Sequence, residues 1–290
     1  MSSKQQLVWL ITGTTSGFGQ RLVAAALARG DRVIATARSF EKLQEVYSST
    51  PSDNLRLLQL DIVSGLESIK QAIDIAAKFW DRIDVLVNNA GNGYLGLIEE
   101  SGSKMIRQQF ETNVFGTIDV TNAVLPYMRA RKQGTVVVIG SRSIWRADTP
   151  GLGTYAASKA AIHALTEALS KELAPINIRV LLVAPGAFRT EGIYGIPFNT
   201  SNPISDYDDL RNMANSRYLQ IPGNEPGDPV KAMEVLVDVV RGEGCAKGKK
   251  WPTVLPLGQD AEADMRGKWD AFMNVLEEWG NIVRSVCFPG

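Results

Sequence analysis

The sequence predicts an α/β fold with a doubly wound parallel sheet and helices on both faces. Six short apolar runs alternate with segments in which apolar residues recur at helical spacing, and each run ends in small or polar residues. Continuous apolar runs are typical of strands buried on both faces, and their alternation with helices favours a parallel sheet with its ligand site at the carboxyl ends of the strands. No internal repeat or low-complexity linker interrupts this order, so we expect one domain over residues 1–290.

The expected strands are residues 7–11, 32–36, 55–60, 84–87, 135–139 and 178–184, with a candidate seventh at 254–255. Helical periodicity is clearest in residues 64–80, 104–131, 229–241 and 259–286. Asp228 before Pro229 predicts a helix start, since the carboxylate can accept from free N–H groups and proline fits the first helical position. We divide the domain into a cofactor-binding and catalytic core (1–190), a substrate lid loop (191–228) and a C-terminal helical extension (259–286).

The charge balance gives no indication of a nucleic-acid or anionic-membrane partner, because Lys+Arg and Asp+Glu are 31 each. No apolar run approaches the ~20 residues of a membrane-spanning helix, and the short polar N-terminus leaves no room for a signal peptide. Cys245 and Cys287 lack metal-ligand spacing, and the single histidine, His163, is interpreted as structural. We therefore expect a cytoplasmic protein with reduced thiols and no metal site.

A glycine-rich turn follows the first expected strand. Gly13, Gly17 and Gly19 have the spacing G-x-x-x-G-x-G, which differs from the common G-x-G-x-x-G pattern. Between a strand and a helix, such a turn places backbone N–H groups where they can hold a phosphate, and glycine lets the backbone approach it. A turn with a purely structural role is the alternative. A Walker A loop is excluded because its Gly-Lys-Ser/Thr ending is absent.

Ala37 and Arg38 follow the second expected strand, where the adenosine ribose of a dinucleotide would lie. Sites for NAD commonly place a carboxylate here, whereas an arginine accommodates the 2′-phosphate of NADP. No carboxylate precedes Arg38, so we predict NADP(H) as the preferred cofactor and NAD(H) as the alternative. Arg38 would otherwise be an ordinary exposed arginine.

Tyr155 and Lys159 stand four residues apart at the start of a helical pattern, so both side chains should project from one face of the helix. A neighbouring cation lowers the pKa of a tyrosine, which would let Tyr155 exchange a proton with a substrate oxygen. Taken alone, the pair also fits a packed tyrosine beside a solvated lysine.

Five motifs in order make the chain resemble the classical short-chain dehydrogenase/reductase family over residues 7–190. They are Thr12-Gly13-(x)3-Gly17-Phe18-Gly19, Asn88-Asn89-Ala90-Gly91, Asn113, a serine after the fifth strand, and Tyr155-(x)3-Lys159. Residues 255–261 look like the subgroup with retinol-dehydrogenase-like, 17β-hydroxysteroid-dehydrogenase-like and fungal ketoreductase-like members. The resemblance implies a Rossmann-type fold.

The resemblance also implies a role for each matching residue. Asn113, Ser143, Tyr155 and Lys159 would form a catalytic tetrad, in which Lys159 can hold the nicotinamide ribose and Asn113 orders a water. The family's serine commonly stands thirteen residues before the tyrosine, where this chain has Arg142; a one-residue deletion selects Ser143, and Ser141 is the alternative. The residues implied at the cofactor are Gly13, Thr15, Ser16, Gly17, Phe18, Gly19, Arg38, Asp61, Ile62, Asn89, Ala90, Gly91, Tyr155, Lys159, Pro185, Gly186 and Thr190.

Apolar side chains in the lid and in other strand-end loops suggest a hydrophobic substrate pocket. We expect Tyr94, Trp145, Tyr194 and Phe198 to contact the substrate, and the alternative is that these aromatics fill a small core of the lid. The amphipathic segment 259–286 could close over the pocket, pack on the core or meet a second subunit.

We therefore predict an NADP(H)-dependent oxidoreductase that transfers hydride between the nicotinamide and a bulky apolar ketone, aldehyde or secondary alcohol. Tyr155 would act as general acid/base, and Ser143 would stabilise charge on the reacting oxygen. The resemblance favours a homodimer or homotetramer built on the helices before and after the fifth strand. The alternatives are a catalytically silent NADP(H)-binding sensor or scaffold, and a redox-neutral epimerase or dehydratase on the same fold.

Overall fold

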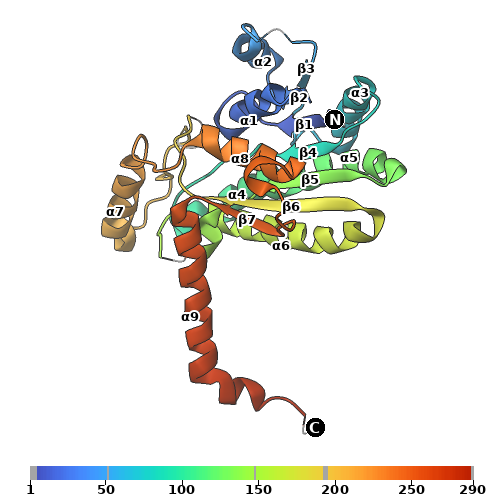
Figure 1. Ribbon diagram of the computed structural model, residues 1–290. Helices are drawn as coiled ribbons and strands as arrows, with labels where there is room; N and C mark the ends of the chain where they lie inside the picture. The colour runs from blue at the N-terminus through green and yellow to red at the C-terminus, as the bar shows by residue number, and fades with distance from the viewer. Residues whose placement is uncertain (1–4, 51, 147, 192–194, 289–290) are drawn as a thin grey trace.

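A computed structural model describes residues 5–50, 52–146, 148–191 and 195–288. Its centre is a parallel seven-stranded sheet with the order β3-β2-β1-β4-β5-β6-β7 (Figure 1). The chain winds outward in both directions from β1 and β4, which confirms the doubly wound Rossmann-type fold and the seventh strand. The strands are β1 (Val8–Thr12), β2 (Arg32–Ala37), β3 (Leu55–Gln59), β4 (Val85–Asn88), β5 (Gly134–Ile139), β6 (Ile178–Pro185) and β7 (Val254–Leu257).

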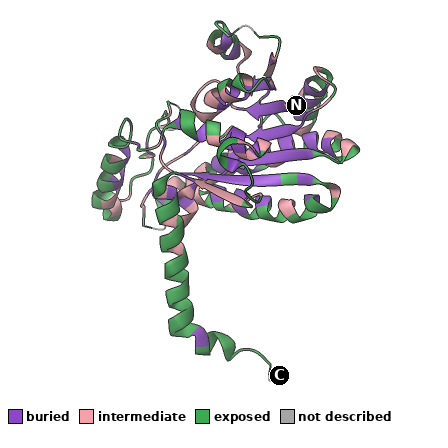
Figure 2. Ribbon diagram, viewed as in Figure 1, coloured by how far each residue is buried: buried purple, intermediate pink, exposed green. Residues whose placement is uncertain are grey.

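Helices cover both faces of the sheet, and the buried residues concentrate between these layers (Figure 2). One face packs against α1 (Gly17–Ala28), α2 (Phe40–Tyr47) and α8 (Pro229–Arg241). The other packs against α3 (Leu66–Lys78), α5 (Thr117–Arg131) and α6 (Gly153–Leu173). Asp228 caps α8 as predicted, since its carboxylate accepts from the Val230 N–H at 2.9 Å.

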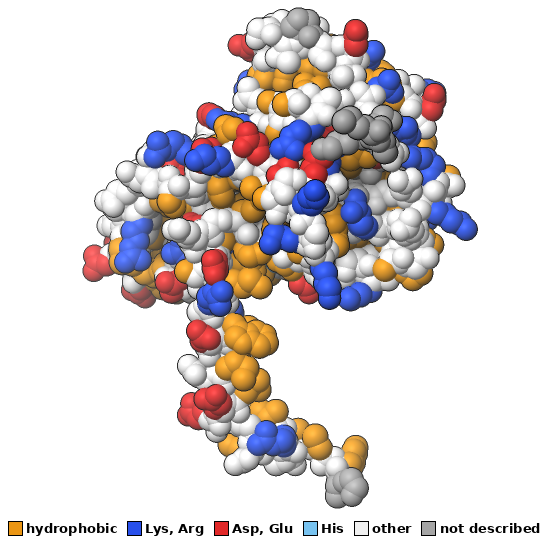
Figure 3. All heavy atoms as spheres, in the orientation of Figure 1, with side chains coloured by type: hydrophobic (Ala, Val, Ile, Leu, Met, Phe, Trp, Pro, Cys, Tyr) orange, Lys and Arg blue, Asp and Glu red, His pale blue; other side chains and the backbone are white. Residues whose placement is uncertain are grey.

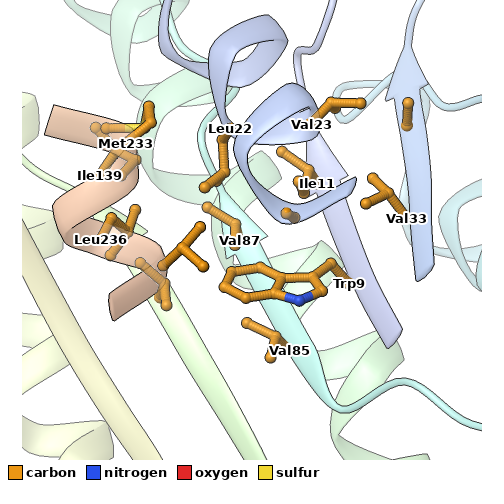
Figure 4. Packing of buried hydrophobic residues seen from close by; sticks show 14 of the residues in the cluster. Trp9, Ile11, Leu22, Val23, Val33, Val85, Val87, Ile139, Met233 and Leu236 are labelled. Carbon is orange, nitrogen blue, oxygen red and sulfur yellow. The ribbon is translucent and has the colours of Figure 1, made fainter. Parts of the chain in front are cut away.

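The strand β1 supplies both hydrophobic cores, because successive side chains point to opposite faces. Val8 and Leu10 belong to one cluster, and Trp9 and Ile11 belong to the other. Figure 4 shows Trp9 in a cluster with Leu22 of α1 and other residues of the sheet and α8. The continuous apolar run thus reflects a strand that is covered on both sides.

A buried ion pair ties β1, β2 and α8 together at the amino-terminal edge of the sheet. Asp31 is fully buried and accepts from the Trp9 indole N–H at 2.9 Å and the Leu7 N–H at 3.0 Å. Arg241, at the end of α8, donates to the same carboxylate at 2.6 Å. The pair therefore satisfies groups from three segments that lie far apart in the sequence.

The remaining helices refine the sequence-based boundaries. The predicted helical stretch 104–131 is three elements: α4 (Ile98–Phe110), the π-helical turn η1 (Glu111–Gly116) and α5. The predicted lid loop contains η4 (Ser205–Tyr207) and α7 (Asp208–Leu219). The C-terminal helix α9 (Gln259–Arg284) extends away from the body of the molecule (Figure 1).

Within the described ranges, no helix has the length and apolar character needed to cross a membrane. Short 3-10 turns are η2 (Arg142–Trp145), η3 (Ala174–Ile176) and η5 (Gly244–Ala246).

We expect Asp31→Ala to lower the free energy of unfolding by about 3–5 kcal/mol, because it leaves the buried Trp9 indole N–H without its acceptor and removes one of the two carboxylates, Asp31 and Glu243, that pair with Arg241. Urea unfolding followed by tryptophan fluorescence measures the change. Glu67→Ala is the control, since Glu67 is 80% exposed in its pair with Lys70, and its removal should cost about 1 kcal/mol or less. Equal losses in the two variants would contradict a structural role for the buried pair.

Candidate active site

Four segments with predicted site residues end at the same edge of the sheet. Gly13 follows β1, Asn89 follows β4, Ser141 follows β5 and Gly186 follows β6. These strands are neighbours and parallel, so their carboxyl ends lie side by side. The fold therefore brings together residues that are separated by up to about half of the chain.

The glycine turn is held tightly against the end of β4. Gly13 adopts φ 69°, and a Cβ at this position would lie 2.8 Å from the Ala90 Cα. A Cβ on Gly19 would overlap the Gly13 carbonyl oxygen. The Asn89 side chain donates to the carbonyl oxygens of Thr12 and Gly13, each at 2.9 Å. Glycine is thus required by close backbone approach, and Asn89 fixes the shape of the turn.

The N–H groups of this turn can hold an anion. The Gly17 N–H donates to the Glu191 carboxylate at 3.1 Å, and Arg21 of α1 also pairs with Glu191. These contacts, above all the hydrogen bond from Arg21, lower the pKa of Glu191 to about 2. The carboxylate occupies the N-terminal end of α1 as a phosphate oxygen would, so the turn fits the pyrophosphate of a dinucleotide. Thr190 lies beside the same turn, because a Cβ on Gly17 would be 3.8 Å from the Thr190 Cβ.

The predicted adenosine end of the site lies at the ends of β2 and β3. Ala37 is buried and Arg38 is exposed, with the Gln59 side chain donating to the Arg38 carbonyl oxygen at 2.9 Å. Asp61 accepts from the Val63 N–H at 3.1 Å and is half-buried, and Ile62 is buried. The arrangement leaves the Arg38 side chain free to meet a phosphate.

The helix α6 presents Tyr155 and Lys159 one turn apart. The Lys159 Nζ lies 5.8 Å from the centre of the Tyr155 ring and donates to the Ile139 carbonyl oxygen at 2.8 Å. Burial lowers the pKa of Lys159 to about 8. The ammonium form therefore still predominates at neutral pH.

Burial raises the pKa of the Tyr155 phenol, and a hydrogen bond with Ser141 partly opposes this. The expectation that Lys159 lowers the tyrosine pKa is therefore wrong for the protein alone, because loss of hydration outweighs the distant ammonium. The raised pKa keeps the phenol protonated at neutral pH. A protonated phenol is the form that can donate to a developing alkoxide.

Of the two candidate serines, the alternative Ser141 is the one that contacts the Tyr155 phenol. Ser141 hydrogen-bonds with the phenol, and its Oγ accepts from the Ser143 N–H at 3.1 Å. The Ser143 hydroxyl is buried and has no hydrogen-bond partner among the described residues. Ser141 is the residue that caps η2, whereas Ser143 lies within that turn.

Asn113 lies on the π-helical turn η1 and is buried. Its side chain accepts from the Asn92 N–H at 3.0 Å and donates to the Asn92 carbonyl oxygen at 2.9 Å and to the Ser158 hydroxyl at 3.1 Å. A Cβ on Gly91 would lie 3.1 Å from the Asn113 Oδ1 and 3.7 Å from the Lys159 Nζ. Asn113, Gly91 and Lys159 are thus neighbours.

His163 also belongs to the candidate site. The sequence-based interpretation of His163 as structural did not anticipate this position. Its Nε2 accepts from the Ser141 N–H at 3.2 Å. Burial, and secondarily the Lys159 charge, lower the pKa of His163 to about 4, so the imidazole is neutral at physiological pH. The signal was present in the sequence, since Tyr155, Lys159 and His163 recur at intervals of four on one helix face.

The residues predicted to contact substrate do not form one group. Tyr94 is half-buried, and its N–H donates to the Gln109 side chain at 2.7 Å. Trp145 packs edge-on against His163 with ring centres 6.1 Å apart. Phe198 instead belongs to a small cluster with Ala214 and Tyr218, which is the alternative that the sequence left open. Tyr194 lies outside the described residues.

A cleft of about 770 Å³ lies next to these loops. Its apolar lining includes Leu97, Ile144 and Leu152, and α6 contributes Ala156 and Ala160. Each of these alanines directly follows Tyr155 or Lys159 in the sequence, so it faces about 100° around the helix from them. The described lining of the cleft includes Ser143 but not Tyr155, Ser141 or Lys159.

Comparison with known proteins identifies the family. The family model for short chain dehydrogenases matches residues 7–194. The chain belongs to the short-chain dehydrogenase family. This assignment includes the glycine turn, the residues after β4 and β5, and the Tyr155–Lys159 pair.

Three individual proteins illustrate the similarity. YusZ of Bacillus subtilis (strain 168), an uncharacterized oxidoreductase, is 36% identical over 78% of this chain and 82% of its own length. A short-chain dehydrogenase from Streptomyces avermitilis has a solved structure with TM-score 0.85 and 36% identity, covering 98% of this chain and 100% of that one. The closed form of a serine dehydrogenase complexed with NADP+ has TM-score 0.70 and 28% identity, covering 87% and 94% of the two chains.

We expect His163 to make stability depend on pH. In the unfolded chain its pKa returns to about 6.5, so between pH 6.5 and 4 the unfolded state binds more protons and stability falls as pH falls. Between pH 7 and 5 this should remove about 2 kcal/mol from the free energy of unfolding. Urea unfolding at several pH values would show the loss, and His163→Gln should show a flatter profile. Parallel profiles would contradict neutral burial of the imidazole.

Proposed function

We propose that the protein is an NADP(H)-dependent oxidoreductase that interconverts an apolar carbonyl compound and the corresponding alcohol. The observation that carries the proposal is the half-buried Tyr155, which hydrogen-bonds with Ser141 and has Lys159 beside its ring, close to a glycine turn whose Gly17 N–H holds a carboxylate. These groups would serve proton donation and anion binding at one edge of the sheet.

Cofactor binding rests on the fit of this edge to a dinucleotide. The N–H groups of Thr15, Ser16, Gly17 and Phe18 would meet the pyrophosphate, and Glu191 would move aside for it. Arg38 would meet a 2′-phosphate, and Ala37 presents no opposing carboxylate. The serine dehydrogenase with NADP+ supports this preference. A bound nicotinamide supplies the hydride, and the protein supplies orientation and the proton.

Proton transfer is assigned to Tyr155 and its neighbours. The phenol donates to the substrate oxygen as negative charge develops there, and the Ser141 hydroxyl stabilises the same charge. Lys159 supplies a positive charge close to the ring. Asn113 holds the loop that carries Gly91 against this cluster through its hydrogen bonds to Asn92.

The substrate is proposed to be bulky and apolar. Tyr94 and Trp145 lie half-buried in strand-end loops. Gly93 packs on the Tyr155 ring, since a Cβ added to Gly93 would lie 3.5 Å from that ring. Such a lining favours a hydrophobic ketone, aldehyde or secondary alcohol. Phe198 is assigned to the lid's own packing instead. A cytoplasmic location accords with two exposed free cysteines.

We expect Tyr155→Phe to lower kcat by about a thousandfold, because the phenyl ring keeps the packing but cannot donate a proton. Nicotinamide absorbance with NADPH or NADH and a panel of apolar ketones and aldehydes measures turnover. Cofactor binding, followed by NADPH fluorescence, should persist in the variant. Binding without turnover across a broad panel would favour a silent sensor, and conversion without net cofactor consumption would favour an epimerase or dehydratase.

We expect Ser141→Ala to lower kcat by about a hundredfold or more, because it removes a hydroxyl donor at the reacting oxygen. Ser143→Ala is the matched control and should stay within about twofold, since the Ser143 hydroxyl makes no hydrogen bond among the described residues. Steady-state kinetics of both variants with NADPH compares them. The opposite ranking would restore Ser143 as the catalytic serine.

A further inference from the structure

The helix α9 carries an apolar stripe that nothing in the described part of the chain covers. Only Ala261 and Gly280 of α9 are buried. Trp269 is 66% exposed and Trp279 is 51% exposed. Figure 3 shows hydrophobic side chains gathered along one side of the projecting helix, and Figure 2 shows the helix exposed over most of its length.

The stripe has the spacing of a helix-pairing seam. Six members lie on α9 at alternating intervals of four and three residues: Met265, Trp269, Phe272, Leu276, Trp279 and Val283. Val286 continues this spacing in the turn that follows the helix. Such a repeat keeps one apolar seam facing a partner helix. Met273, Val275 and Ile282 flank the seam and widen the apolar face. Asn274 and Asn281 lie on the opposite side of the helix.

The exposed apolar area matches what a dimer requires. Eleven exposed large apolar side chains lie between residues 265 and 288. At on the order of 100 Å² each they expose on the order of 1,000 Å², more than the largest patch of a typical monomer. Two copies that bury this surface against each other would reach roughly 2,000 Å², which is the size of a specific interface.

The charge of α9 disfavours a membrane as the partner. The helix carries six acidic and three basic side chains. Helices that lie on anionic membranes are rich in lysine and arginine on their polar face. A second copy of the chain, by contrast, presents the same apolar seam and makes a self-complementary, closed contact.

The start of α9 fixes its direction relative to the body. Arg142 pairs with Asp264 at 2.7 Å and with Asp260 at 3.3 Å. Asp260 also accepts from the Ala187 N–H at 2.8 Å. These contacts anchor the first turns to the loops after β5 and β6, so the rest of the helix points outward from the body (Figure 1).

We propose that the apolar stripe of α9 is the surface through which this chain associates with a second copy of itself. The two stripes pack against each other, which removes the tryptophans from water. This interface is separate from the one that family resemblance places on the helices flanking β5, and both can exist in one assembly.

Sedimentation of the full chain over a wide concentration range tests the proposal. The wild type is expected to form a species of at least two chains. Leu276→Glu combined with Trp279→Glu should raise the dissociation constant of the α9-dependent step about a hundredfold or more, because charges enter the seam. Asn274→Glu combined with Asn281→Glu adds the same charge on the other side of the helix and should leave the mass unchanged.

A monomeric wild type, or a seam variant with the wild-type mass, would overturn the proposal. Flotation of the wild type with phosphatidylcholine or phosphatidylserine vesicles in place of self-association would overturn it as well. The seam variant should retain the wild-type urea midpoint and circular dichroism, which separates loss of association from misfolding. A failure of the redox function would leave the sedimentation result unaffected.

Discussion

The contact between the ends of β1 and β4 sets the geometry on which the site depends. The Thr12 hydroxyl accepts from the N–H groups of Asn89 and Ala90 at 3.0 and 2.9 Å, and the Asn89 side chain returns two hydrogen bonds to the Thr12 and Gly13 carbonyl oxygens. An amide is suited to this position because its NH₂ group can donate twice. A Cβ on Gly19 would lie 2.6 Å from the Asn89 Nδ2, so this contact requires a glycine at position 19.

The geometry of the site also depends on a buried acceptor for the Ser141 N–H. A buried backbone donor must be paired, and the neutral His163 imidazole pairs this one. Protonation of His163 would replace the acceptor with a donor and bring a second cation close to Lys159. The lowered pKa of His163 therefore preserves both the placement of Ser141 and the balance of charge around Tyr155.

The sequence predicted those features whose cause lies within a few neighbouring residues. Buried strands, the capped start of α8 and the Tyr155–Lys159 pair follow from periodicity, capping chemistry and helix geometry. The choice between Ser141 and Ser143 was not local, because it depends on where η2 begins and on which hydroxyl the turn directs to α6. The same holds for Phe198, whose partners Ala214 and Tyr218 lie on a helix that the lid's irregular composition concealed.

The two ends of α9 differ in their contacts with the rest of the chain. Its first turn is tied by Asp260 and Asp264 to Arg142, the residue between the two serines, and thereby supports the loop after β5. Beyond Asp264, the large apolar side chains of α9 are 38–66% exposed, and an isolated helix in water gains nothing from exposing them. The folding of a single copy of the chain therefore does not explain the heptad spacing of the stripe. A pairing helix from a second copy accounts for this spacing.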